Sequence, residues 1–101
     1  MKIEDYLHEG AAAALTSAEL AKLLHIEPRE VQKHVQAARL RGIPICASNT
    51  EPYGLYIAET PEELERYLKS FNRRLKEMNT TVLALGNTHA EMIGQQTIEG
   101  A

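Results

Sequence analysis

The residues most suited to binding chemistry are basic and amide side chains gathered between positions 28 and 41. This segment holds four basic residues and one acidic residue, a local net charge of +3, although the whole chain carries −3. Ammonium and guanidinium groups neutralise phosphates, and together with glutamine amides they donate hydrogen bonds to base edges. The candidate DNA-binding residues are Arg29, Gln32, Lys33, Gln36, Arg39 and Arg41.

The order of these residues along the segment separates two expected roles. The first four lie near its start, where a helix in the major groove brings side chains closest to base edges. Glutamine can make two hydrogen bonds to adenine, and arginine or lysine can pair with guanine. Arg39 and Arg41 lie at the far end and are expected to contact phosphates. The alternative interpretation is an ordinary solvated helix face.

Three features predict that this segment is the second helix of a closely linked pair. Thr16 and Glu19 have the spacing of a capping box, which predicts a first helix that ends near residue 24. Residues 25–27 are enough only for a tight turn, and Pro28 suits the first turn of the next helix. Apolar residues at helical spacing predict the buried stripe of that second helix. They are Val31, Val35 and Ala38.

A β-hairpin is expected directly after the second helix. Gly42 follows basic residues and is expected to end the helix. Residues 43–48 and 53–58 have the composition of strands, and residues 49–52 between them have that of a turn. The sequence therefore predicts a two-stranded wing.

The N-terminal residues predict one more helix before the pair. The alanines at 11–14 favour a helix over residues 2–14, and Leu15 is expected in a short extended link. The resulting order predicts an α+β, mostly helical fold, a winged helix-turn-helix with a three-helix core and a two-stranded β-hairpin wing. A long C-terminal helix is expected to follow.

Several positions of this region also match a known pattern. They are Leu20-Ala21, Leu24, Val31, Val35, Ala38-Arg39 and Gly42-Ile43-Pro44-Ile45. With them, residues 15–45 resemble the helix-turn-helix of biotin-repressor-type and related bacterial winged-helix regulators, and residues 52–57 resemble their Gly-Tyr-type wing strand. The helix from Pro61 to Arg74 is similar to that of short prophage-encoded winged-helix proteins. The resemblance implies DNA binding and a regulatory or phage-related role.

Acidic residues depart from that pattern at three places. The turn carries Glu27-Pro28 where many members of this group have Ser or Thr followed by Arg. Glu30 lies near the front of the second helix, where it repels phosphate unless it accepts a hydrogen bond from a cytosine amino group. The wing tip holds Glu51 and no basic residue, which predicts a poor DNA contact.

A long helix is expected to begin at residues 60–63, which form a second capping box with proline at the first helical position. Its apolar residues recur in alternating steps of four and three, and the series can continue through His89 to Met92. This is the coiled-coil pattern and predicts self-association into a homodimer. The alternative is one amphipathic helix that packs on its own domain. The candidate dimerisation residues are Leu64, Leu68, Phe71, Leu75, Met78, Val82 and Leu85.

The expected organisation is one small domain followed by an interaction helix. The winged helix-turn-helix domain is assigned to residues 1–58, the C-terminal helix to 59–93 and a disordered tail to 94–101. The seven acidic and five basic residues after residue 58 contrast with the positive charge of the second helix.

Several classes of protein are not expected from this sequence. No long apolar run predicts a membrane span, and the first residues lack the apolar core of a secretory signal. Cys46 is the single cysteine, so we expect an intracellular, cytoplasmic protein without an internal disulfide. The histidines lack metal-ligand spacing, and no catalytic motif is present. We expect no enzyme activity, no metal and no cofactor.

Two functions remain open at this point. The favoured one is sequence-specific binding of double-stranded DNA by a homodimeric transcriptional regulator of bacterial or phage origin. The alternative is a protein-interaction module on a winged-helix scaffold, such as a phage-encoded inhibitor or adaptor of a nucleic-acid-binding partner. The acidic wing, Glu30 and the net charge of −3 favour this alternative.

Overall fold

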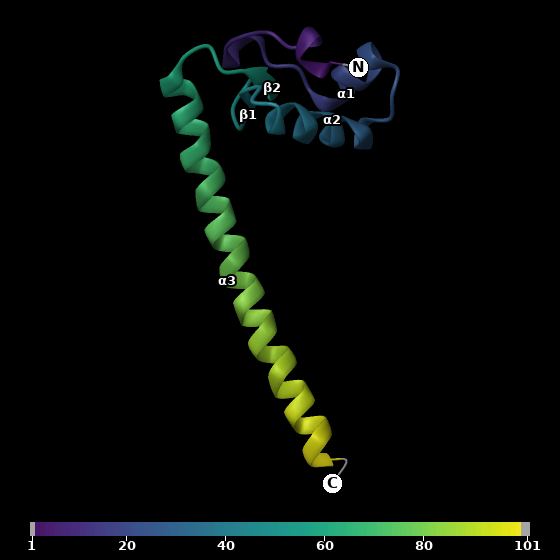
Figure 1. Cartoon of the computed structure of the whole chain (residues 1–101), viewed down its shortest axis with the longest axis vertical. Helices are drawn as coiled ribbons and strands as arrows, with labels where there is room; N and C mark the ends of the chain where they lie inside the picture. The colour runs from purple at the N-terminus through teal and green to yellow at the C-terminus, as the bar shows by residue number, and fades with distance from the viewer. Residues whose placement is uncertain (1, 100–101) are drawn as a thin grey trace. The chain divides into compact units, whose positions relative to one another are not determined.

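The computed structural model describes residues 2–99, which form a mostly helical α+β fold (Figure 1). The helices are α1 (Ser17–Leu24), α2 (Pro28–Leu40) and α3 (Pro61–Glu99), and the strands are β1 (Ile45–Ser48) and β2 (Gly54–Ile57). The chain divides into two compact units, one ending at Tyr67 and the other beginning at Leu68. The predicted class and the long C-terminal helix are confirmed, and the first turns of α3 belong to the N-terminal unit.

The helix expected over residues 2–14 does not form. Two short 3-10 turns, η1 (Ile3–Tyr6) and η2 (Ala11–Ala13), stand in its place. Between them the backbone pairs with β2: the Gly10 N–H donates to the Ile57 carbonyl at 2.9 Å, and the Ile57 N–H donates to the His8 carbonyl at 2.8 Å. Pairing with the sheet outweighs the helix propensity of the alanines. The prediction of a three-helix core is therefore wrong in its first helix.

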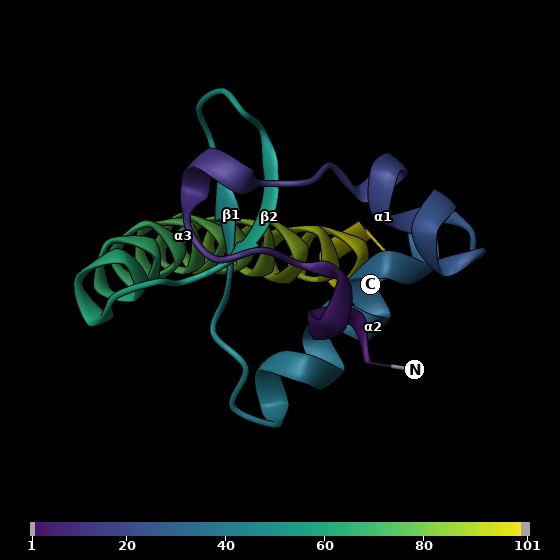
Figure 2. The same ribbon diagram turned by 90° about the horizontal axis from the view of Figure 1, so that it is seen from above.

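The sheet is an antiparallel hairpin in which Ile45 lies opposite Ile57, and both strands lie within the segments that the sequence predicts. Leu15 extends this sheet, because it exchanges backbone hydrogen bonds with Leu55 at 2.9 and 2.7 Å. Figure 2 shows the extended chain before α1 crossing β2, to which the bridge between Leu15 and Leu55 joins it. The close approach requires Gly54, whose φ is +134° and where a Cβ atom would overlap the Leu15 backbone.

The start of α1 confirms the predicted capping box. The Thr16 hydroxyl accepts a hydrogen bond from the Glu19 N–H at 3.1 Å, and the Glu19 carboxylate accepts one from the Thr16 N–H at 3.2 Å. These bonds satisfy amide groups that have no partner within the helix. They fix where α1 begins.

The tight turn between α1 and α2 depends on one left-handed residue. His25 has a φ of 57°, and the next N–H, that of Ile26, donates to the Ala21 carbonyl at 3.1 Å. Such a bond satisfies one of the last carbonyls of the helix and reverses the chain within a few residues. Pro28 then opens α2 as predicted. Gly42, with a φ of +95°, ends α2 in the same way.

The core lies between the helix pair, the hairpin and η1. The stripe predicted for α2 is confirmed, because Val31, Val35 and Ala38 have no exposed surface. Apolar side chains from the other elements complete this cluster. They are Ile3, Leu7, Leu20, Ala21, Leu24, Ile45 and Leu55. Burial of one face of α2 leaves its opposite face to solvent.

The predicted start of α3 is confirmed, and its end lies beyond the predicted one. The Thr60 hydroxyl accepts from the Glu63 N–H at 3.1 Å, while the Glu63 carboxylate accepts from the Glu59 N–H at 2.9 Å. The helix continues to Glu99, so the disordered tail expected over residues 94–101 differs from the structure up to that point. Gly94 alone lowers helix stability too little to end the helix. Residues 100 and 101 lie outside the described residues.

Candidate nucleic-acid interface

The exposed face of α2 brings four of the six candidate residues together. Arg29, Gln32, Lys33 and Gln36 are all exposed, and their spacing places them on one face of the helix, opposite the buried stripe. Within residues 2–99, no hydrogen bond or ion pair engages these four side chains. Leu40 lies on the same face and is 79% exposed. The face therefore offers two cations, two amides and one apolar contact.

Arg39 points away from that surface. Its Nε donates to the Ile45 carbonyl at 2.9 Å, and its Nη2 donates to the Tyr67 hydroxyl at 3.0 Å. The guanidinium carbon also lies 5.4 Å from the centre of the Tyr67 ring, a cation–π geometry. Arg39 thus links α2 to β1 and to the first turns of α3. The structure does not place it with the four residues above.

Arg41 is likewise engaged within the fold. Its guanidinium makes a bidentate contact with the Glu4 carboxylate, at 2.7 and 3.1 Å. This pair ties the end of α2 to η1, and the hydrogen bond from Arg41 lowers the pKa of Glu4 below its ordinary value. Arg39 and Arg41, for which the sequence predicts phosphate contacts, are therefore both engaged in contacts within the fold. A helix wheel alone does not reveal partners as distant in sequence as Tyr67 and Glu4.

The acidic residues near α2 reduce the positive potential of its exposed face. Glu27 is exposed at the N-cap of α2, and Glu30 in the first turn is half-buried. A carboxylate in the first turn stabilises the helix through its dipole. With Arg39 and Arg41 engaged elsewhere, the cations Arg29 and Lys33 remain for an external phosphate.

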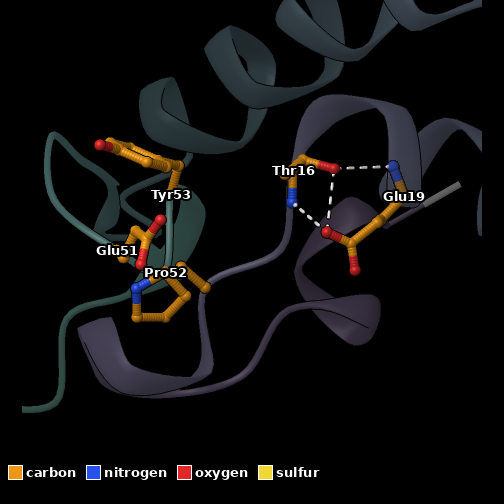
Figure 3. Close-up of a pocket in the computed structure, with 6 residues that line it drawn as sticks. Thr16, Glu19, Glu51, Pro52 and Tyr53 are labelled. Atoms are coloured by element: carbon orange, nitrogen blue, oxygen red, sulfur yellow. Dashed lines mark hydrogen bonds between the residues drawn. The ribbon is translucent and has the colours of Figure 1, made fainter.

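The tip of the hairpin forms one side of an open depression, shown in Figure 3. Thr16 and Glu19 lie on its other side, where they bond to each other. Glu51 and Tyr53 come from the hairpin, and the Tyr53 side chain is 56% exposed. The depression therefore presents two carboxylates beside an exposed aromatic ring. This chemistry repels phosphate and suits a cationic partner.

The predicted dimerisation residues form an exposed stripe along α3. Leu64 is half-buried, and the other six are exposed, Met78 at 66% and Val82 at 63%. In a heptad repeat they occupy the a and d positions, which face the partner helix in a coiled coil. Among the e and g positions between residues 65 and 88, only Glu65 and Arg74 are charged. Two copies can therefore meet along most of this stripe without repulsion between like charges.

A second group of cations lies in α3 and is not among the candidate residues predicted from the sequence. All five basic residues that follow residue 58 fall between Arg66 and Lys76, and no acidic residue lies among them. The total of seven acids and five bases over the whole segment hides this cluster. A charge count in a window of about three helical turns reveals it. The members are Arg66, Lys69, Arg73, Arg74 and Lys76.

Cys46 is buried in β1 opposite Tyr56 of β2. Burial raises the pKa of the Cys46 thiol, and it raises that of Tyr56 to about 12. A buried thiol with a raised pKa is a weak nucleophile. Among residues 2–99, no group of three histidine, cysteine or acidic side chains is placed to hold a metal ion.

Comparison with protein-family models, with curated proteins and with solved structures found no significant match to this chain. In the part of the chain that the structure describes, no helix has the combined length and apolar character that crossing a membrane requires.

Proposed function

We propose that this chain is a winged helix-turn-helix protein that binds double-stranded DNA through α2. The helix pair α1 and α2 is joined by a tight turn, and the hairpin follows directly after α2. The bridge between Leu15 and Leu55 adds a third extended segment to the hairpin. In helix-turn-helix proteins the second helix of such a pair lies in the major groove.

The observation that carries this proposal is the composition of the exposed face of α2. Arginine or lysine pairs with guanine, and glutamine pairs with adenine. These side chains need no rearrangement of the fold to reach a ligand, since none is engaged within residues 2–99. We assign base contact to Arg29, Gln32, Lys33 and Gln36 and leave Arg39 and Arg41 as fold-stabilising residues.

The protein would act as a homodimer joined along the a and d positions of α3. A dimer with two-fold symmetry reads two half-sites that lie about one helical turn, ~34 Å, apart. This mode of action requires no cofactor and no catalysis. It fits a cytoplasmic transcriptional regulator of bacterial or phage origin.

The affinity for duplex DNA at increasing salt concentration tests this function. Binding that neutralises several phosphates weakens steeply as salt rises. The variant Arg29→Gln/Lys33→Gln should bind a selected target sequence at least tenfold more weakly, because each bidentate pair with a base contributes about 1–3 kcal/mol. Lys2→Gln/Lys22→Gln removes the same charge from exposed sites outside α2 and should have a smaller effect. No binding by the unchanged chain at low salt would contradict the proposal.

The acidic depression at the hairpin favours a second candidate, a protein-interaction module. Glu19 and Glu51 would attract a basic partner, and Tyr53 supplies an aromatic anchor of the kind that is enriched at interfaces. A basic peptide is a suitable probe. Binding that is abolished in Glu51→Gln/Tyr53→Ser, together with no affinity for duplex DNA, would favour this function over the first.

A further inference from the structure

The basic cluster of α3 contains a stripe of aligned cations. Lys69, Arg73 and Lys76 are separated by four and then three residues, which places them on one face of the helix. All three are exposed. We call these three residues the α3 basic stripe. Arg74 points elsewhere, because its guanidinium carbon lies 5.4 Å from the centre of the Phe71 ring.

Like charges at this spacing repel one another and destabilise the helix that carries them. No acidic residue lies between Lys69 and Lys76, and Glu65 and Glu77 lie at the two ends of the stripe, four residues from Lys69 and from Arg73. A polyanion that lies along the stripe replaces repulsion with attraction. The stripe spans about 10 Å of helix axis, over which duplex DNA presents about six phosphate charges.

The stripe lies away from the apolar seam of α3. In the heptad that places Leu68 and Leu75 at a positions, Lys69 and Lys76 occupy b and Arg73 occupies f. These positions face outward in a coiled coil. Self-association through the seam therefore leaves the stripe open to a ligand, and each copy in a dimer contributes one stripe.

We infer that the α3 basic stripe contacts the phosphate backbone of duplex DNA and supplies affinity that does not depend on sequence. The inference rests on the proposed function in one respect, which is that duplex DNA is the partner. It assigns the phosphate contacts to α3, whereas the sequence alone assigns them to Arg39 and Arg41. Those two arginines are occupied by Tyr67, Ile45 and Glu4.

The experiment compares two doubly substituted full-length chains in titrations of a mixed-sequence duplex at several salt concentrations. Arg73→Gln/Lys76→Gln removes two positive charges from the stripe. Ala84→Glu/Asn87→Glu changes the net charge by the same amount at outward positions with the same spacing, about 16 Å farther along the helix. That distance exceeds the Debye length of ~8 Å at physiological salt. Circular dichroism and sedimentation should match the unchanged chain for both variants.

The stripe variant should bind at least tenfold more weakly at low salt. The slope of log K against log salt should fall by about 0.9 for each phosphate that the variant no longer neutralises. The charge-matched control should keep the original slope, and Arg73→Lys/Lys76→Arg should retain binding because it keeps both charges. Equal slopes for the stripe variant and the unchanged chain would overturn this inference.

The failure of the inference differs from the failure of the proposed function. If Arg29→Gln/Lys33→Gln weakens binding and Arg73→Gln/Lys76→Gln does not, DNA binding through α2 stands and the role of the stripe is wrong. If only the stripe variant weakens binding, the role of the stripe stands and the recognition role of α2 is wrong. If the unchanged chain does not bind duplex DNA at low salt, both are wrong. A weakening in the stripe variant that is confined to single-stranded DNA would also overturn the inference.

Discussion

At the residue scale, Arg39 and Arg41 show that basic side chains on one helix can have different roles, either within the fold or at its surface. Both lie near the end of α2, yet Arg39 bonds to β1 and Tyr67, and Arg41 pairs with Glu4. Arginine suits such contacts because its planar guanidinium can bond to several acceptors at once. The exposed cations Arg29 and Lys33, earlier in α2, have no such contacts within residues 2–99. Contacts within the fold therefore separate structural arginines from candidate ligand-binding ones.

A substitution at Gly54 tests the close packing of the hairpin against the Leu15 backbone. Its φ of +134° and the adjacent Leu15 backbone leave no space for a side chain. Gly54→Ala should lower the free energy of unfolding by about 2 kcal/mol or more, because strain and steric overlap act together. Chemical denaturation measures the change. Gly86→Ala is the matched control, since it lies in open space within α3 and should raise helix stability by up to about 1 kcal/mol.

The raised pKa of Tyr56 predicts that the folded protein loses stability at high pH. A tyrosine in the unfolded chain ionises near pH 10, whereas burial beside Cys46 raises the pKa of folded Tyr56 to about 12. The unfolded state therefore loses this proton first as pH rises. The stabilisation is complete below pH 10 and disappears between pH 10 and about 12. Tyr56→Phe should make unfolding less sensitive to pH in this window, and an unchanged pH dependence would count against the assignment.

At the element scale, the start of α1 depends on a single side chain that makes two local bonds. Thr16→Ala removes the hydroxyl that accepts from the Glu19 N–H. The expected loss of stability is about 1 kcal/mol, which is typical for removal of an N-cap. Thermal unfolding measures it. Ser17→Ala, at the next position, should cost less, because the Ser17 hydroxyl makes no hydrogen bond within residues 2–99. Equal losses in the two variants would show that the cap contributes little.

The elements built on local patterns could be predicted from sequence. The capping residues Thr16 and Thr60 mark helix starts, Gly42 marks a helix end, and the apolar stripe of α2 marks its buried face. The segment from residue 2 to residue 14 could not be predicted in this way. Its local preference is helical, but Ile57 of β2, far along the chain, draws its backbone into pairing. Non-local pairing of this kind leaves no periodic signal.

The candidate site likewise has one part that local patterns predict and one part that contacts between distant residues determine. The exposed face of α2 could be predicted because helical spacing separates Arg29 and Lys33 from the buried valines. The contacts of Arg39 with Tyr67 and of Arg41 with Glu4 could not, since these partners lie 28 and 37 residues away in the chain. The α3 basic stripe was predictable in principle, because it depends only on local charge.

At the scale of the whole molecule, the exposed seam of α3 predicts a homodimer. Sedimentation of the full chain should give twice the chain mass of 11.3 kDa. Leu75→Asp/Val82→Asp places charges at two a positions and should give a monomer. Arg73→Asp/Thr80→Asp places the same residues at outward f positions and should remain dimeric. A full-length monomer at tens of micromolar would contradict the coiled-coil interpretation and favour the alternative of an amphipathic helix that packs on its own domain.

We propose that α2 is the surface that reads duplex DNA. The most direct test of this proposal is an NMR titration of the isotope-labelled full chain with a duplex that carries a selected target sequence. If α2 reads the duplex, the amide signals of residues 29–36 should shift most, and those of Glu51 and Tyr53 at the hairpin tip should shift little. Shifts centred on the hairpin tip, or no shifts at low salt, would contradict the proposal.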